Sequence, residues 1–200
     1  MKSKLALFSL LLLAVPFMGG CKGWLRGGNN KLVVTYKPDR NASPITKELE
    51  VKQSDMAVSE LTTTANGQAA RIVMYSIVLT NYEVDAKEFH KELPSKDNQI
   101  KVEIEVVGAD GSSKTTPLKP GTYNASQPSD GVNRFNKAMT IRVLIYENGQ
   151  VMEQSLSTVN PRKGHVTINS VDDDTVTGEI DMSDDFRSVK GEFRAEIIKR

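Results

Sequence analysis

Few residues of this chain combine the types and the spacing that catalysis requires. The 200 residues include two histidines, His90 and His165, which lie far apart in the sequence and belong to no metal-binding pair. No serine sits in a Gly-x-Ser-x-Gly elbow, and no phosphate-cradling glycine loop precedes a helix pattern. The single cysteine, Cys21, follows an apolar leader. We therefore predict that the protein is not an enzyme and uses no cofactor.

Acidic residues near the C-terminus form the pattern that most resembles a metal site. Two groups of aspartates are expected on neighbouring loops, and they comprise Asp172, Asp173 and Asp174 in the first and Asp181, Asp184 and Asp185 in the second. Calcium is bound by about six to eight oxygen ligands, which carboxylates from two adjacent loops could supply. The spacing does not match an EF-hand loop, and acidic turn residues are usually solvated. Calcium binding and simple solvation both stay open.

An irregular segment, residues 119–137, holds the residues that could contact a ligand. It is rich in proline, glycine, amides and hydroxyls, and a loop of this length in a compact domain is often functional or mobile. Tyr123, Arg134 and Phe135 are the plausible contributors to a site for a small molecule or a carbohydrate. The alternative for Tyr123 is simple packing at one end of the fold.

The N-terminal residues are organised as an export signal. Lys2 and Lys4 precede residues 5–18, which are almost entirely apolar. A membrane-spanning helix needs about 20 apolar residues, whereas the apolar region of a secretory signal needs only about 7–15. Residues 1–20 are therefore predicted to be a cleaved signal peptide and not a membrane span.

The end of this signal carries a recognisable motif. Met18-Gly19-Gly20-Cys21 resembles the lipobox of bacterial lipoproteins, with Met18 where leucine is usual. The resemblance implies that Cys21 is acylated and becomes the first residue of the mature chain. Several acyl chains would anchor it, because one chain binds only marginally at about 0.8 kcal/mol per methylene. Lys22 in place of aspartate implies the outer membrane. An ordinary secreted protein is the alternative.

The segment after the motif, residues 21–31, is predicted to be a flexible tether, because it contains glycines, amides and basic residues but no acid. Removal of Lys2 and Lys4 reduces the 26 basic residues to 24 against 25 acidic ones, a formal net charge of −1. No basic cluster follows residue 31, which argues against a nucleic-acid partner. The expected partners are the membrane, through the lipid on Cys21, and another envelope protein.

Residues 32–200 are predicted to form one all-β domain. Residues 100–106 alternate apolar and charged side chains, which is the period of a strand with one buried face. Related patterns predict strands at 32–36, 48–52, 56–62, 71–79, 139–143, 151–156, 166–168, 176–182 and 189–197. About ten strands joined by hairpins are typical of an antiparallel β-sandwich, and a β-barrel is the alternative.

Turn-forming residues separate several of these strands. Asn66-Gly67, Asp110-Gly111 and Asn148-Gly149 readily adopt the positive φ angles of tight turns, and Asp172-Asp173-Asp174 separates two further strands. Together they predict four hairpins. Residues 85–93 lack strand alternation and end before Pro94, so we expect at most a two-turn helix or a loop there.

These features favour a lipid-anchored envelope protein whose non-catalytic β domain acts as a protein-interaction or scaffold module. Small-ligand or carbohydrate binding by loops at one end of the domain is the alternative. A deep pocket or an enclosed barrel cavity lined by residues 119–137 would favour the ligand, and a filled core with a flat exposed apolar patch would favour the protein partner. The closing segment, residues 178–197, is similar to the Gly-x-Phe-x-Ala endings of many uncharacterised bacterial lipoproteins, a resemblance that implies no activity.

Overall fold

The computed structural model describes residues 30–65, 67–85, 88–156 and 162–197, so the signal peptide, Cys21 and most of the tether lie outside the described residues. This part of the chain contains eleven strands and one 3-10 turn, η1 (Pro128–Asp130). The strands are β1 (Lys31–Tyr36), β2 (Ile45–Glu50), β3 (Gln53–Ala65), β4 (Gln68–Thr80), β5 (Ile100–Val107), β6 (Gly121–Ala125), β7 (Lys137–Glu147), β8 (Gln150–Glu153), β9 (Lys163–Val171), β10 (Thr175–Ser183) and β11 (Arg187–Glu196). None of its helical turns has the length and hydrophobicity of a membrane span.

All strands belong to one sheet. Ten of them follow the order β2-β1-β11-β10-β9-β6-β7-β5-β4-β3, and β8 pairs with β7 beside this path. The pairings between these strands are antiparallel except that of β6 with β7, which is parallel and short. The all-β prediction is confirmed. The sheet is open, because its path ends at β2 and β3, so the closed-barrel alternative is wrong.

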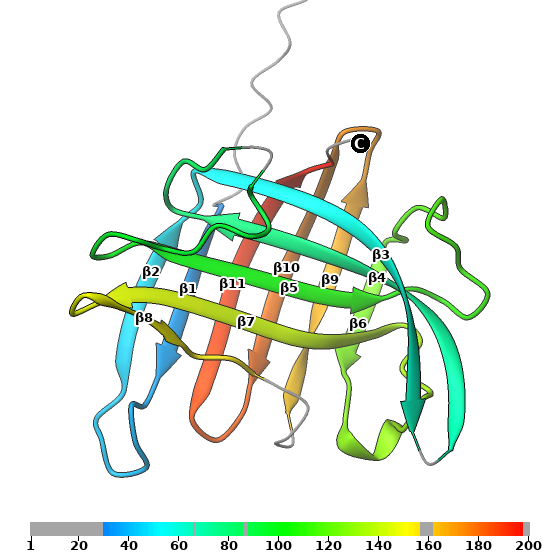
Figure 1. Cartoon of the computed structure of the whole chain (residues 1–200), viewed down its shortest axis with the longest axis horizontal. Helices are drawn as coiled ribbons and strands as arrows, with labels where there is room; N and C mark the ends of the chain where they lie inside the picture. Colours follow the sequence, from blue (N-terminus) through cyan, green and yellow to red (C-terminus); the bar gives the residue numbers. More distant parts are fainter. Residues whose placement is uncertain (1–29, 66, 86–87, 157–161, 198–200) are drawn as a thin grey trace, which may run out of the picture.

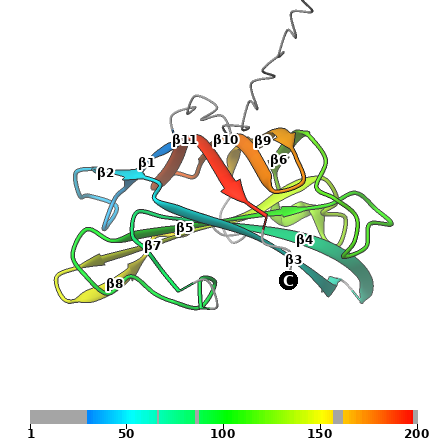
Figure 2. The same ribbon diagram turned by 90° about the horizontal axis from the view of Figure 1, so that it is seen from above.

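The sheet folds over itself, as Figures 1 and 2 show. The first layer consists of β2, β1, β11, β10, β9 and β6, and the second consists of β7, β8, β5, β4 and β3. The strands of one layer cross those of the other in Figure 1. Alternate side chains of every strand except β8 point between the layers and bury one apolar core, which includes Val102 and Ile104 of β5 and Ile180 and Met182 of β10.

Three of the four predicted hairpins are present, namely β3–β4, β7–β8 and β9–β10. The fourth, at Asp110-Gly111, is wrong. Gly111 does adopt a positive φ of 75°, but β5 already pairs with β4 on one edge and β7 on the other. The chain that leaves β5 therefore has no free edge to return to and runs through a long loop to β6.

Part of the segment predicted to be irregular, residues 119–137, is the strand β6. Its residues Tyr123 and Ala125 are buried, while Thr122 and Asn124 are exposed, so the strand alternates over a very short length. Residues 88–92 form hydrogen-bonded turns, which agrees with the loop option for this segment. Residues 86–87 lie outside the described part of the chain.

The β4–β5 connection covers the outer face of the second layer. Lys101 of β5 points toward this connection and is only 1% exposed. Its ammonium group donates to the carbonyl oxygens of Phe89 (3.2 Å), His90 (2.9 Å) and Glu92 (3.1 Å) and pairs with Oε1 of Glu103 (3.0 Å). The alternation of β5 predicts that Lys101 is exposed to solvent, but the β4–β5 connection buries it.

Candidate functional site

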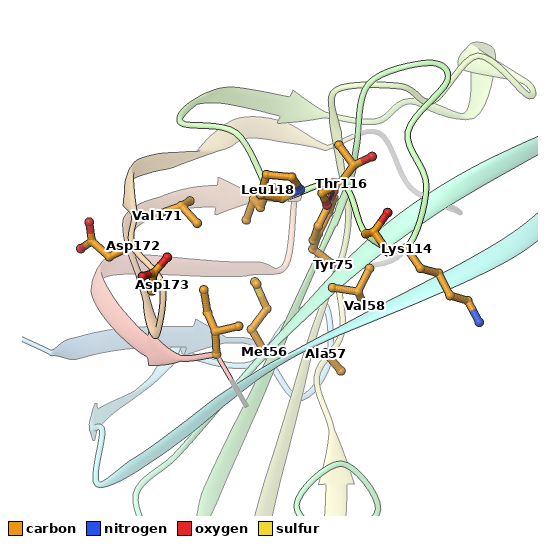
Figure 3. A pocket seen from close by; sticks show the side chains of 13 residues that line it. Met56, Ala57, Val58, Tyr75, Lys114, Thr116, Leu118, Val171, Asp172 and Asp173 are labelled. Carbon is orange, nitrogen blue, oxygen red and sulfur yellow. Dashed lines mark hydrogen bonds between the residues drawn. The ribbon is translucent and has the colours of Figure 1, made fainter. Parts of the chain in front are cut away.

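A pocket of about 610 Å³ lies at one corner of the molecule, where the two layers of the sheet meet (Figure 3). Its walls come from four parts of the chain: β3 with β4, the β5–β6 loop, the β9–β10 turn and the residue that follows β11. At this corner an isolated backbone bridge between Met56 and Ile197 joins the layers. The pocket is therefore a property of the tertiary fold and not of one loop.

The walls of the pocket are mainly apolar. Met56 and Val58 alternate with Ala57 along β3, so their side chains share the inner face of the strand. Val171 and Ile197 come from the opposite layer and pack against the core, to which the buried Leu118 of the β5–β6 loop belongs. Such a surface favours contact with hydrocarbon over water.

The rim of the pocket is polar and carries both signs of charge. Lys114, Asp172 and Asp173 line it and are exposed to solvent. Thr115, also exposed, and Thr116 add hydroxyl groups on the β5–β6 loop. An apolar interior with a polar rim suits a molecule that has a hydrocarbon part and a polar end.

Tyr75 of β4 holds the loop that forms one wall. Its buried hydroxyl donates a 2.6 Å hydrogen bond to the carbonyl oxygen of Thr116. Burial raises the pKa of Tyr75, so the phenol stays protonated as a donor at neutral pH. Within the loop, the hydroxyl of Thr116 accepts the backbone N–H of Ser113 at 2.9 Å. The wall is thus fixed to the core by a specific hydrogen bond.

The three ligand residues proposed from the sequence do not form one site. Tyr123 is buried in β6, and its hydroxyl donates to the carbonyl oxygen of Lys119 at 2.8 Å, as its packing alternative predicts. The Nε of Arg134 donates to the carbonyl oxygen of Gly131 at 2.7 Å. Phe135 packs on a small apolar cluster of β4, β5 and β7 that faces away from the main core. Tyr123 and Phe135 therefore lie on opposite sides of the second layer.

The two groups of aspartates are also separated. Residues 172–174 form the turn at one end of β10, and residues 184–185 lie in the turn at its other end, about 30 Å away along nine extended residues. Asp181 and Asp184 each pair with a cation of β11. No group of three histidines, cysteines or acidic residues in the described ranges could hold a metal. The expectation that these turns are neighbours is wrong.

The two histidines lie in different layers. His90, in the β4–β5 connection, places its Nε2 2.8 Å from Oδ2 of Asp55 on the outer face of the second layer. His165 is in β9 of the first layer, opposite Asn124 of β6 and Asp181 of β10. The structure therefore does not bring them together, and Cys21 lies outside the described residues.

Sequence reasoning missed the pocket because its walls are assembled from segments that range from residue 56 to residue 197. The predicted turn at Asp172-Asp173-Asp174 is one wall of the pocket, and the absence of strand alternation at residues 114–118 is the sequence signal for a second. Similarity gives no further guide to the function of this pocket. Among protein-family models, curated proteins and solved structures, none matches this chain.

Proposed function

We propose that this protein is a lipid-anchored protein of the bacterial outer membrane whose β domain binds the apolar part of a small amphiphilic ligand. The pocket of about 610 Å³ is the observation that carries the proposal. Its volume falls within the range of roughly 300–1,000 Å³ that is usual for small-molecule sites, and its walls are mainly apolar. The folded-over sheet acts as a sandwich-like body with one open corner, and the domain binds without catalysing a reaction.

The anchor in this proposal is Cys21, acylated after removal of residues 1–20. The similarity of Met18-Gly19-Gly20-Cys21 to a lipobox supports it. The direct measurement is mass spectrometry of the mature N-terminus, which should find Cys21 carrying acyl chains. An unmodified N-terminus at another residue would remove the anchor and leave the binding domain.

The apolar walls predict how the affinity depends on the length of the ligand's hydrocarbon chain. Each methylene that leaves water for an apolar site contributes about 0.8 kcal/mol. Two additional methylenes should therefore tighten binding by about 1.6 kcal/mol, which is roughly 15-fold in Kd, until the pocket is full. A series of saturated fatty acids of increasing length, titrated by displacement of a fluorescent fatty acid, measures this dependence.

The pocket can be blocked by a substitution at Val58. The mature chain carrying Cys21→Ser is titrated with the fluorescent fatty acid, and Val58→Trp is compared with Val151→Trp. Val151 lies on β8, is 37% exposed and is not part of the pocket, so it offers the same change at a neutral place. We expect Val58→Trp to abolish binding and Val151→Trp to retain it, with circular dichroism showing that both variants are folded.

Equal affinity of the two folded tryptophan variants would show that the fatty acid binds elsewhere. Absence of any binding by the Cys21→Ser chain, at ligand concentrations below micelle formation, would reject the proposed function altogether.

A second candidate, a protein-interaction module, is favoured by the edge strand β3. It ends the sheet path, and Leu61 on this strand is 45% exposed. An edge strand offers unpaired backbone groups to a segment of another protein. Crosslinked pull-down from envelopes should then lose a partner with Leu61→Lys and keep it with Val151→Lys. Recovery of the same proteins by both variants would contradict this candidate.

A further inference from the structure

Part of the pocket wall, namely Asp172, Asp173 and Ile197, lies at the end of the first layer where β1 begins. Because β9, β10 and β11 are antiparallel, the β9–β10 turn and the C-terminal end of β11 lie at the same end of the layer (Figure 1). β1 begins there too, since Lys31 pairs with Glu192. Asn30 is fixed at this end: its Oδ1 accepts the backbone N–H of Arg194 at 3.0 Å, and its carbonyl oxygen accepts that of Val51 at 2.9 Å.

Only a few residues of chain separate this end of the first layer from the pocket wall and from Cys21. Ile197 in the pocket wall lies three residues beyond Arg194, or about 10 Å along an extended strand. Cys21 precedes Asn30 by nine residues, which span at most about 30 Å when fully extended. A lipid on Cys21 would therefore hold Asn30 within about 30 Å of the bilayer. The β10–β11 turn lies at the opposite end of β10, about 30 Å from the pocket end along the strand.

We propose that the pocket faces the membrane in which the protein is anchored and that its ligand is a single-chain lipid amphiphile taken directly from that bilayer. This inference rests on the proposed function and on the anchor at Cys21. The apolar walls, including Met56 and Val58, receive the chain. The rim, with Lys114 on one wall and Asp172 on another, keeps the polar end in water.

Transfer of such a ligand should be faster when the pocket lies close to the bilayer, because its hydrocarbon chain is poorly soluble in water. A chain that leaves the bilayer for water loses about 0.8 kcal/mol per methylene, so free transfer through water becomes rarer with every carbon. A pocket held beside the lipid headgroups shortens the distance that the chain must cross in water. Tethering also replaces a bimolecular encounter by an intramolecular one with a high effective concentration.

The orientation is tested with two matched label sites. Cys21 is the single cysteine of the chain and is blocked by its lipid, so a second cysteine is the one free thiol of the lipidated protein. Asp174→Cys places a donor dye at the pocket end of β10, and Asp185→Cys places it at the opposite end. Both residues are exposed aspartates in hairpin turns. The proteins are reconstituted in phosphatidylethanolamine–phosphatidylglycerol vesicles that contain an acceptor lipid.

We expect strong energy transfer to the bilayer from the label at residue 174 and weak transfer from the label at residue 185. Equal transfer, or stronger transfer from residue 185, would overturn the orientation.

The exchange is tested with a fluorescent fatty acid placed in the same vesicles. Lipidated wild-type protein is compared with the Cys21→Ser chain at equal micromolar concentration, and the labelled chain bound per protein is followed with time. Anchoring should increase uptake by about 10²-fold, because the membrane-held ligand is presented at high effective concentration. Lipidated Val58→Trp should lose this uptake, and lipidated Val151→Trp should keep it.

The outcomes separate the two proposals. If the Cys21→Ser chain binds the fatty acid in solution but anchoring brings no increase, the membrane-facing inference is wrong and the proposed function stands. If no form binds the fatty acid, the proposed function itself fails. Uptake that increases on anchoring but survives Val58→Trp would show that the ligand is held outside the pocket.

Discussion

The stability of the domain should depend strongly on the buried ammonium group of Lys101. It donates to three loop carbonyl oxygens and pairs with Glu103 at 3.0 Å, almost completely shielded from water. Lys101→Met keeps the aliphatic stem and removes the charge. The change leaves a carboxylate and several carbonyl oxygens without this donor beneath the β4–β5 connection.

The size of the effect follows from the burial. Removal of one partner of a buried ion pair destabilises proteins by about 3–5 kcal/mol, and each buried carbonyl left without a donor adds to this loss. Glu103 retains a 3.5 Å contact with Arg142, which limits the penalty on its side. We therefore expect a loss of about 3–4 kcal/mol in the free energy of unfolding.

The measurement is urea unfolding of the mature Cys21→Ser chain, followed by circular dichroism. Lys190→Met is the matched control, because Lys190 pairs with Asp181 in solvent at 3.1 Å and exposed pairs contribute only about 0–1 kcal/mol. The double variant Lys101→Met, Glu103→Gln should lose less than the sum of its single changes. A loss below about 1 kcal/mol for Lys101→Met, or one no larger than that for Lys190→Met, would refute the reasoning.

Four further predictions concern other positions. Burial raises the pKa of Glu105, so ionisation of its carboxyl group opposes folding, and the free energy of unfolding falls as the pH rises through the folded-state pKa. Glu105→Gln should therefore unfold at a higher urea concentration than the wild type at pH 7. This difference in urea midpoint should shrink toward pH 4. A Cβ on Gly178 would lie 2.6 Å from the ring of Phe193 and against the backbone of β9, so Gly178→Ala should cost about 3 kcal/mol. Gly67→Ala, where φ is positive but the space is open, should cost about 1 kcal/mol in the same unfolding assay. Tyr75→Phe removes the donor to Thr116 and should lower stability by about 1 kcal/mol and weaken fatty-acid binding in the fluorescence titration; unchanged affinity would show that the loop needs no such restraint.

The sequence predicted those strands whose signal is local. β5 alternates over seven residues, 100–106, and its flanking strands β4 and β7 are long and apolar enough to be found in the same way. β6 escaped because only Tyr123 and Ala125 mark its buried face, and its partner in β9 lies about forty residues later. Alternation reports which residues share a face, but it does not report what covers that face.

Alternation likewise does not predict which charged residues are buried or which residues line the pocket. Lys101 has the spacing of a solvated residue and is buried because the β4–β5 connection folds over it. The pocket needs Val58, Leu118 and Val171 to meet, and their meeting depends on how the two layers cross. The acidic turns were wrongly expected to be neighbours although the alternation at 176–182 predicts a strand between them, because β10 extends over nine residues and places the turns at its opposite ends.

The two layers are fastened unequally at their two sides. On one side the sheet is continuous, because β6 pairs with β7 and the N–H of Ser126 donates to the carbonyl oxygen of Ala138 at 2.8 Å. On the pocket side an isolated bridge joins Met56 to Ile197. The layers should therefore separate more readily beside the pocket than at the β6–β7 pairing. Amide hydrogens near residues 56 and 197 should exchange faster than those of residues 124–126 and 137–138. The rate of this local opening would then set how long a ligand stays in the pocket.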